Sequence, residues 1–524
     1  WTDLIQRENP DIIIGYNIFG FDYKFMIERA DELYCKGDFL RLSRNRGEKC
    51  QVKHTTIKIA SGVHDLKYID MNGRVPIDLY NYFRREYNLS SYKLDDVASH
   101  FIGDFVKKFE YQEGQTIIHS PNIRGLRKGN YVIFEIIGNS SELYRRGKKF
   151  NVESIKGNTF TITDTIQAEG KIRWSLVKDD VTPQDIFRLS NGTSADRAVV
   201  GKYCIQDCML VNHLLNKNDM LTGFTEFANI CSIPISFVIL RGQGIKLLSF
   251  VGKKCRDKDT LLPDVRKGAS GDGYEGAICL KPKCDLYLDN PIAVVDYGSL
   301  YPSSMISENI SHDSKVWTKE YDLAGNLLKE TGSDRYDHLK EYEYVDIQYD
   351  TYRWQRLREG GREIKTKVGY KICRFAQFPE GKKAIMPSIL VELLAARKAA
   401  RAFIKYKTVT SEAGDVVKGL VTKADVGVIV TTKTGEKHHI KNIQKIEDTY
   451  DDFMKNIFDK RQLGYKVTAN SLYGQCGAKT SSFYDKDIAA STTATGRKLL
   501  LYAKRVIEEV YKNRVCETAY GKAV

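Results

Sequence analysis

An apolar run that ends in an aspartate and is soon followed by a proline constrains this chain more than any other feature. Residues 292–295 (Ile-Ala-Val-Val) are typical of a buried β-strand, and Asp296 follows them directly. Pro302 cannot join a central ladder, so the strand must end before it. A carboxylate at the end of a buried strand is costly to desolvate unless it meets a cation. The pattern suits a divalent metal beside a phosphate chain, but on this motif alone an ordinary strand that ends in an acidic loop is the favoured interpretation.

A second motif lies far downstream, at residues 466–474 (Lys-Val-Thr-Ala-Asn-Ser-Leu-Tyr-Gly). Lys466, Asn470 and Tyr473 are spaced i, i+4 and i+7, so they share one face of a helix, which Gly474 is predicted to end. A cation, an amide and an aromatic ring on one face suit a triphosphate and a stacked base. A solvated helix face is the alternative, and the small and apolar flanking residues disfavour it.

These two motifs resemble those of a known family. The segment 296–303 (Asp-Tyr-Gly-Ser-Leu-Tyr-Pro-Ser) is similar to motif A of the family B DNA polymerases, and 466–474 is similar to motif B, in the same order and separation. The likeness covers nearly the whole chain. It is nearest to the replicative polymerases of large nucleocytoplasmic DNA viruses, with polymerase delta more distant.

The resemblance implies a multidomain protein of mixed α/β and α+β class. It would contain an RNase-H-like 3′–5′ exonuclease domain, a ferredoxin-like palm, helical fingers and two small β insertions. The expected divisions are an exonuclease domain at 1–235, a connector and the first part of the palm at 236–384, fingers at 385–480 and the second part of the palm at 481–524. The insertions are expected at about 115–178 and 410–442, where apolar and polar residues alternate between turn signals.

For motif A, the resemblance implies that Asp296 binds the catalytic metal ions, two Mg²⁺ per active site with Mn²⁺ possible as a substitute. The backbone of Ser299, Leu300 and Tyr301 would hold the phosphates of the dNTP substrate. Tyr301 would also pack beneath the sugar and exclude a 2′-hydroxyl group.

The fingers are expected to supply cations to the same triphosphate. Arg397 and Arg401 are spaced i, i+4 in a helical pattern that begins near Pro387. Like charges at this spacing repel slightly unless an anion lies between them, and the resemblance places the triphosphate there, opposite a catalytic Lys466. A basic solvated stripe is the alternative. The resemblance further implies nucleotide binding by Asn470 and Tyr473. It implies DNA contacts by Gly474, Tyr274 and Gly276, and a glycine-rich turn is almost as good an interpretation of the last two.

The first part of the chain carries a nuclease-like pair of motifs. Residues 11–22 are typical of a strand, a turn and the start of a helix, and they place Asn17, Phe21 and Asp22 where the family has its second exonuclease motif. Tyr203 and Asp207, one helical turn apart, match the third motif. The resemblance implies metal binding by Asp22 and Asp207, orientation of the attacking water by Tyr203, and DNA contacts by Asn17 and Phe21.

Composition agrees with an anionic partner, primer–template DNA, without identifying it. The chain has 81 basic and 67 acidic residues, a formal net charge of +14. Its eleven cysteines are scattered and form no pair of CxxC units, so we predict neither a zinc module nor a disulfide framework. No apolar run is long enough to span a membrane. The family also implies a sliding-clamp-type processivity partner and a location in the host nucleus or a cytoplasmic viral factory.

We expect the first exonuclease motif before Trp1, and the third polymerase motif and thumb after Val524. We therefore expect this chain alone to be inactive in both reactions. A catalytically inactive, polymerase-like DNA-binding scaffold is one alternative function, although such a protein would be expected to lose the carboxylates of Asp22, Asp207 and Asp296. A stand-alone nuclease is another, and it has no need of the fingers residues.

Overall fold

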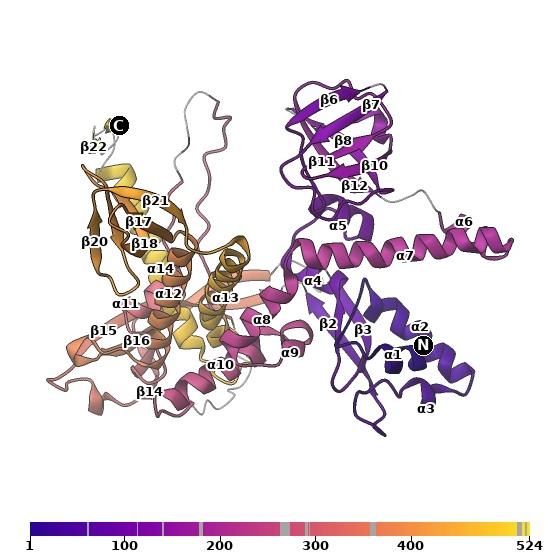
Figure 1. The fold of residues 1–524 in the computed structure, drawn as a ribbon. Coiled ribbons are helices and arrows are strands. Elements are labelled where there is room, and N and C mark those ends of the chain that lie inside the picture. Colours follow the sequence, from indigo (N-terminus) through magenta and orange to yellow (C-terminus); the bar gives the residue numbers. More distant parts are fainter. Residues whose placement is uncertain are drawn as a thin grey trace. The chain divides into compact units, whose positions relative to one another are not determined.

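The computed structural model describes residues 1–59, 62–112, 114–138, 141–177, 182–262, 273–288, 292, 294–356, 363–510, 516–518 and 521–523. The chain divides into two compact units, Trp1–Phe224 and Thr225–Val524, which are described one at a time (Figure 1). The finer division into exonuclease, palm and fingers remains a prediction.

A short parallel strand pair organises the first unit. β1 (Ile12–Gly15) pairs with β4 (Val75–Asp78). The chain then forms the π-helix η1 (Ile18–Asp22) and continues directly into α2 (Tyr23–Glu32). The predicted strand, turn and helix are present. The π-helix was not predicted, because its hydrogen-bond register leaves no periodic signature in five residues.

The remaining helices and strands of this part are α1 (Thr2–Glu8), α3 (Lys36–Phe39), the antiparallel pair β2 (Gln51–Ile59) and β3 (Gly62–Asp70), α4 (Leu79–Glu86), α5 (Leu94–Phe101), α6 (Pro183–Ser190) and α7 (Ser194–Lys217). A capping box starts α7: the Thr193 side chain accepts a hydrogen bond from the Asp196 N–H, and the Asp196 carboxylate accepts one from the Thr193 N–H. This cap fixes the start of the helix that carries Tyr203 and Asp207.

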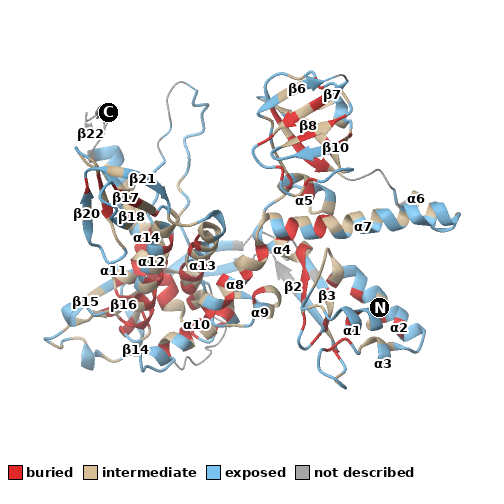
Figure 2. Ribbon diagram, in the orientation of Figure 1, coloured by how far each residue is buried: buried red, intermediate tan, exposed pale blue. Residues whose placement is uncertain are grey.

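An eight-stranded antiparallel sheet lies between α5 and α6 in the sequence. Its order is β5-β12-β8-β10-β11-β7-β6, with β9 paired to β8. Its strands are β5 (Gly103–Phe105), β6 (Lys108–Gln112), β7 (Gln115–His119), β8 (Tyr131–Ile137), β9 (Ser141–Leu143), β10 (Phe150–Lys156), β11 (Thr159–Ile162) and β12 (Lys171–Val177). Phe134, Phe160 and Trp174 fill its interior (Figure 2). The β-rich insertion predicted from the sequence is present, and its strands begin at Gly103.

The second unit is built on a four-stranded antiparallel sheet of order β14-β13-β16-β15. The strands are β13 (Lys315–Asp322), β14 (Leu327–Gly332), β15 (Glu343–Arg356) and β16 (Glu363–Gln377). The helices are α8 (Met220–Cys231), which contains the division between the units, α9 (Ile235–Leu240), α10 (Gln243–Asp257), α11 (Leu300–Ser307), α12 (Ile385–Ile404), α13 (Asp452–Gly477) and α14 (Lys486–Arg505), followed by the π-helix η5 (Val506–Val510). A short pair, β22 (Cys516–Thr518) and β23 (Gly521–Ala523), comes last.

One hydrophobic core joins this sheet to its helices. Phe375 of β16, Met386 and Ile389 of α12, Leu472 of α13 and Ile488 of α14 all belong to it and are fully buried (Figure 2). Because these helices carry the motif residues on their other faces, the core fixes where those residues lie.

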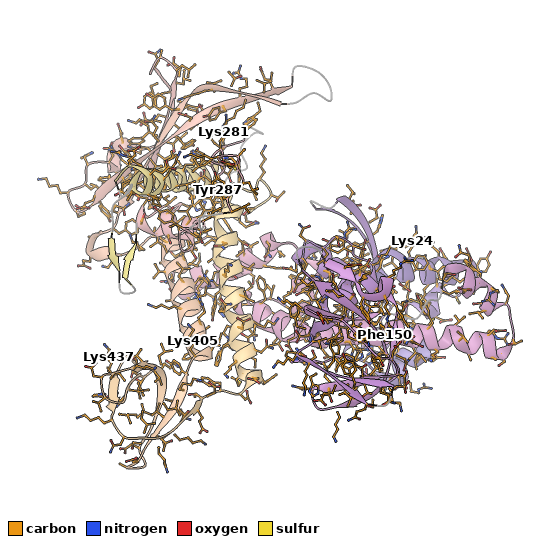
Figure 3. The ribbon with its side chains drawn as sticks, turned by 90° about the horizontal axis from the view of Figure 1, so that it is seen from above. Lys24, Phe150, Lys281, Tyr287, Lys405 and Lys437 are labelled. Carbon is orange, nitrogen blue, oxygen red and sulfur yellow. The ribbon has the colours of Figure 1, made fainter. Side chains whose placement is uncertain are left out.

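A five-stranded sheet of order β20-β19-β18-β17-β21 interrupts the sequence between α12 and α13. Its strands are β17 (Lys407–Ser411), β18 (Val416–Lys423), β19 (Val428–Thr431), β20 (Lys437–Ile440) and β21 (Ile443–Asp448). Figure 3 labels Lys405, which follows α12, and Lys437 on β20, and so shows where this insertion leaves the helix. The predicted insertion is present and extends to Asp448.

The strand predicted for residues 292–295 is absent from the part of this segment that the structure describes. Val294 and Val295 are 89% and 73% exposed and have no strand geometry, and Ala293 lies outside the described residues. A strand forms only where a neighbour supplies backbone hydrogen bonds, and no described strand pairs with this segment. The apolar residues favour a strand, but no described strand is paired with them.

The prediction that Gly474 ends its helix is wrong. α13 continues to Gly477, with Ala478 as its C-cap. Glycine costs only about 1 kcal/mol inside a helix. The buried side chains of Leu472 and Cys476, on either side of Gly474, outweigh that cost and extend the helix.

α14 ends at Arg505 and passes into π geometry through Val510. Residues 511–515 lie outside the described residues.

Candidate active site

The segment that follows Asp296 forms a helix start instead of a strand end. Asp296 is exposed, and Ser299 has left-handed backbone angles (φ 56°, ψ 57°) that turn the chain into α11. The first N–H groups of a helix have no carbonyl partner within it and lie at its positive end. The backbone at Ser299, Leu300 and Tyr301 is therefore suited to bind an anion, with the Asp296 carboxylate next to it in the sequence.

Tyr301 lies against a tyrosine from the second motif. The ring centroids of Tyr301 and Tyr473 are 4.5 Å apart with an interplanar angle of 32°. Tyr274 in turn is hydrogen-bonded to Tyr473, whose pKa is raised by burial and by Tyr274. Three tyrosines that are far apart in the sequence therefore form one contiguous group.

Two glycines make room for these rings. A Cβ atom at Gly477 would lie 2.1 Å from the Tyr274 hydroxyl oxygen, and a Cβ atom at Gly496 would lie 3.0 Å from Cε1 of Tyr301. Neither position could carry a larger residue unless a ring moved.

One stretch of α14 anchors both the Tyr274 turn and the Asp296 segment. Thr493 Oγ1 and Arg497 Nη1 each donate a hydrogen bond to the carbonyl oxygen of Glu275, both at 2.8 Å, and Arg497 Nη1 also donates to the carbonyl of Gly276 at 2.8 Å. Tyr297 donates to the carbonyl of Leu499 at 3.1 Å. The sequence analysis gave Thr493 and Arg497 no role, because contacts across about 220 residues leave no local pattern.

The helices α12 and α13, which carry the candidates predicted to be in the fingers, run antiparallel, side by side (Figure 1). Half-buried Arg397 donates from Nε to Gln462 Oε1 at 3.3 Å, and Phe403 packs on Phe458 with ring centroids 5.2 Å apart. Gln462 is one helical turn before Lys466, so Arg397 lies near the turn that carries that lysine.

The other fingers candidates are exposed. Lys466, Asn470, Gly474 and Arg401 all lie on the surface of their helices. Because α12 and α13 are antiparallel, Arg401 is one turn farther than Arg397 from the Lys466 end. The structure therefore brings Arg397 toward Lys466 more closely than Arg401.

In the first unit, the carboxylates of Asp22 and Asp207 both act electrostatically on the Cys208 thiol. Partial burial raises the pKa of the Cys208 thiol, and the carboxylates of Asp207 and Asp22 raise it further. Both carboxylates are therefore close enough to Cys208 to act on it. Tyr203 lies one turn before Asp207 on α7 and is half-buried.

An exposed aromatic pair flanks Asp22. Phe21 is 64% exposed and stacks on Phe25, with ring centroids 6.4 Å apart and planes within 9° of parallel. Exposed parallel rings of this kind can stack on nucleobases.

A buried aspartate that the sequence analysis missed holds the turn before Asp22. Asp78 is 1% exposed; its Oδ1 accepts from the N–H of Asn17 at 2.7 Å and its Oδ2 from the N–H of Phe19 at 3.0 Å. Asn17 has a left-handed φ of 62°, and Asp78 satisfies the backbone donors that this turn exposes. Asp78 also caps α4 through the N–H of Tyr80.

Family models match most of the chain. The model described as DNA polymerase family B matches residues 233–418 and 406–523, and the model described as DNA polymerase family B, exonuclease domain, matches residues 1–97. This chain belongs to DNA polymerase family B.

Relatives of this chain include viral DNA polymerases. It is 48% identical to the DNA polymerase of Phaeocystis pouchetii virus and 44% identical to that of Pyramimonas orientalis virus, in each case over 98% of this chain but only 47% and 40% of the relative. The catalytic subunit of DNA polymerase delta from Oryza sativa is 27% identical over 98% of this chain and 33% of its own length. The chain thus spans less than half the length of these relatives.

A solved structure shares the fold. The family B DNA polymerase from the hyperthermophilic archaeon Pyrobaculum calidifontis matches with a TM-score of 0.51 at 20% identity, over 96% of this chain and 44% of that one. The predicted fold class and the family resemblance are confirmed.

The carboxylates of the candidate sites are the right type of ligand for magnesium. Asp22, Asp207 and Asp296 offer hard oxygen atoms, which Mg²⁺ prefers. In the described part of the chain, no group of three or more His, Cys, Asp or Glu side chains converges. These residues could hold Mg²⁺ only with water or nucleic-acid oxygens completing its coordination. No helix in the described ranges combines the length and the apolar composition needed to cross a membrane.

Proposed function

We propose that this chain is part of a DNA-directed DNA polymerase that adds dNTPs to a primer 3′-hydroxyl on a DNA template and replicates a viral genome. The observation that carries the proposal is the packing of the Tyr301 ring against the Tyr473 ring, which joins two motifs more than 170 residues apart into one group. The viral relatives support the replicative role.

In this proposal the incoming nucleotide lies over α11. The N–H groups of Ser299, Leu300 and Tyr301 bind the triphosphate at the positive end of the helix, and Lys466 and Arg397 neutralise it from the fingers. Asn470 shares the face of Lys466, and Arg401 would join after a small movement of α12.

Sugar selection would fall to Tyr301. Tyr473 and Gly496 hold its ring from two sides, so the ring cannot move away from a 2′-hydroxyl group. The turn with Tyr274 and Gly276, together with Gly474, would contact the paired DNA.

The exonuclease role is proposed for the first unit. Asp22 and Asp207 would hold metal, Tyr203 would orient the attacking water, and Asn17 and Phe21 would hold the strand being cleaved.

Asp296 of the polymerase site, and Asp22 and Asp207 of the nuclease site, would hold Mg²⁺, two ions per site, with Mn²⁺ as a substitute. Bound there, the ions would activate the attacking oxygen and neutralise the leaving group. Primer–template DNA is the proposed partner, with a sliding-clamp-type protein as a second. The proposed location is the host nucleus or a cytoplasmic viral factory.

Primer extension with a polypeptide of the relatives' full length tests the proposal. Tyr301→Ala is expected to raise the ratio of ribonucleotide to deoxynucleotide incorporation at least ten-fold, whereas Tyr301→Phe, which keeps the ring, leaves the ratio near that of the wild type. Asp296→Asn is expected to abolish extension.

Two results would contradict it. Absence of extension by the wild-type protein with Mg²⁺ or Mn²⁺ would favour the alternative of a DNA-binding scaffold. Extension with an unchanged ratio in Tyr301→Ala would leave the polymerase but remove the role of Tyr301.

A further inference from the structure

The outer half of the β15–β16 hairpin carries aromatic side chains that serve no core. Figure 3 shows the two long strands side by side. Ile347 and Tyr349, in the inner half, are buried, whereas residues 364–368 and 353–355 are all exposed. Trp354 is 37% exposed. Tyr352 is half-buried, and neither ring is among the buried residues of the core of the second unit, so packing in that core does not explain them.

The strand register places two aromatic rings and two lysines on one face. Tyr352 is opposite Lys367, and Trp354 is opposite Lys365. Since side chains alternate between the two faces of a strand, these four share a face, and we call them the hairpin platform. Arg353 and Gln355 lie on the opposite face. A register shift between Thr351 and Tyr352 marks a β-bulge, which increases twist and redirects the side chains that follow.

The platform is itself organised around a cation. Lys365 Nζ lies 3.8 Å from the ring centroid of Tyr352 and 5.7 Å from that of Trp354. Its ammonium group also pairs with Glu275, and Lys367 pairs with Asp350 at 2.8 Å. The Lys365–Glu275 pair is half-buried, whereas the Lys367–Asp350 pair is more exposed. Exposed pairs contribute little to stability, so a phosphate could replace the Asp350 carboxylate.

Glu275 connects the platform to the candidate active site. Arg497 of α14 donates hydrogen bonds to the carbonyl oxygens of Glu275 and its neighbour Gly276, and its other neighbour, Tyr274, is hydrogen-bonded to Tyr473. The Glu275 carboxylate is 3.7 Å from Arg497 Nη2. The platform therefore lies directly beside the group that contains Tyr301 and Tyr473.

We propose that the hairpin platform binds the unpaired template strand of DNA next to the polymerase site. Flat aromatic rings stack on bases of any sequence, and adjacent lysines bind the phosphates between them. In a duplex the bases are stacked on one another inside the helix, so their faces are not available to the aromatic rings. The chain's net charge of +14 favours a polyanionic partner over an uncharged, apolar one. The inference rests on the proposed polymerase function and assigns a further part of its DNA path.

Fluorescence anisotropy with the 524-residue chain tests the inference. The probes are a blunt duplex and the same duplex with a single-stranded 5′ template overhang. Trp354→Ala and Tyr352→Ala are each expected to weaken binding of the overhang probe about five-fold or more and to leave binding of the blunt duplex unchanged. Arg353→Ala and Gln355→Ala, on the opposite face, are the matched controls and should not distinguish the two probes.

Tryptophan emission gives a second readout that a purely structural role would not change. The chain has four tryptophans, of which Trp174 and Trp317 are buried. A single-stranded oligonucleotide should quench the wild-type emission, and Trp354→Phe should remove most of that quenching while keeping most of the affinity.

The outcomes separate the two proposals. If the wild-type chain binds neither probe, the platform is not a template site, and primer extension by a polypeptide of the relatives' full length decides the polymerase function separately. The wild-type chain could instead bind both probes while the platform variants weaken the binding of both probes equally or of neither. In that case, or if Trp354→Phe leaves the quenching intact, the platform is not a template site and the polymerase function stands. Melting temperatures of all variants show whether each one is folded.

Discussion

At the scale of single residues, Asp78 is the least expected finding, because a buried carboxylate is normally costly. Burial raises its pKa from the usual 3.8 to about 6, although the N–H groups of Phe19, Asn17 and Tyr80 lower it in part. The same hydrogen bonds fix the turn that leads to Asp22. The nuclease-like site thus depends on a group that carries no chemistry of its own.

This pKa predicts a pH dependence of stability. Between about pH 4 and pH 6 folded Asp78 holds a proton that the unfolded chain releases, so its contribution is complete below pH 4 and is lost as the pH rises through 6. The rise of this pKa from 3.8 to about 6 corresponds to roughly 3 kcal/mol in the free energy of unfolding. Asp78→Asn should remove this decline, measured by urea unfolding between pH 4 and pH 8.

Asn81→Ala is the control for that measurement. It removes one hydrogen bond to Asp78 Oδ2, of 3.0 Å, without removing the titrating group, so the decline with pH should remain. An Asp78→Asn chain that retains the same decline would show that another group is responsible.

At the scale of elements, α14 is the common support of the candidate polymerase site. Arg497 reaches two carbonyl oxygens of the Tyr274 turn, and its side chain is only 15% exposed. Arg497→Ala should lower the free energy of unfolding of the second unit by about 1–3 kcal/mol, because it leaves both carbonyls without this donor. Arg497→Lys should recover only part of the lost free energy of unfolding, since an ammonium group lacks the planar fork of donors.

Lys498→Ala, at the exposed neighbouring position, is the matched control and should change stability by less than about 0.5 kcal/mol. Urea unfolding followed by circular dichroism measures all three variants. Equal effects of the two alanine substitutions would mean that the contacts of Arg497 do not support the turn.

The same helices show what the sequence could and could not predict. The helices that carry Tyr203, Arg397 and Lys466 were predicted, because a 3.6-residue period is a local property. The strand at 292–295 was not found, because pairing depends on a neighbour rather than on apolar composition. Arg497 was missed for the same reason: its partner is more than 220 residues away. Local patterns predicted the elements, while the contacts between them required coordinates.

At the scale of the whole molecule, the net charge of +14 has a measurable consequence for DNA binding. Each phosphate that a lysine or arginine neutralises releases counterions, so affinity falls with salt, by a log–log slope of about 0.7 per contact for a single strand. Affinity for the overhang probe should therefore fall steeply between 50 and 200 mM salt. Replacing Lys365 and Lys367 together by alanine should reduce the magnitude of the slope by about 1.4.

The salt dependence of the Trp354 variant, set against that of the lysine variants, separates the contribution of charge to DNA binding from that of base stacking. Trp354→Ala should weaken binding at every salt concentration and leave the slope unchanged, because a stacked base releases no counterion. Replacing Lys437 and Lys445 of the fingers insertion, which lie outside the platform, controls for the loss of two charges anywhere on the chain. If that pair reduces the slope as much as the platform lysines do, the lysines act through net charge alone, and only the aromatic rings of the platform would contact the strand.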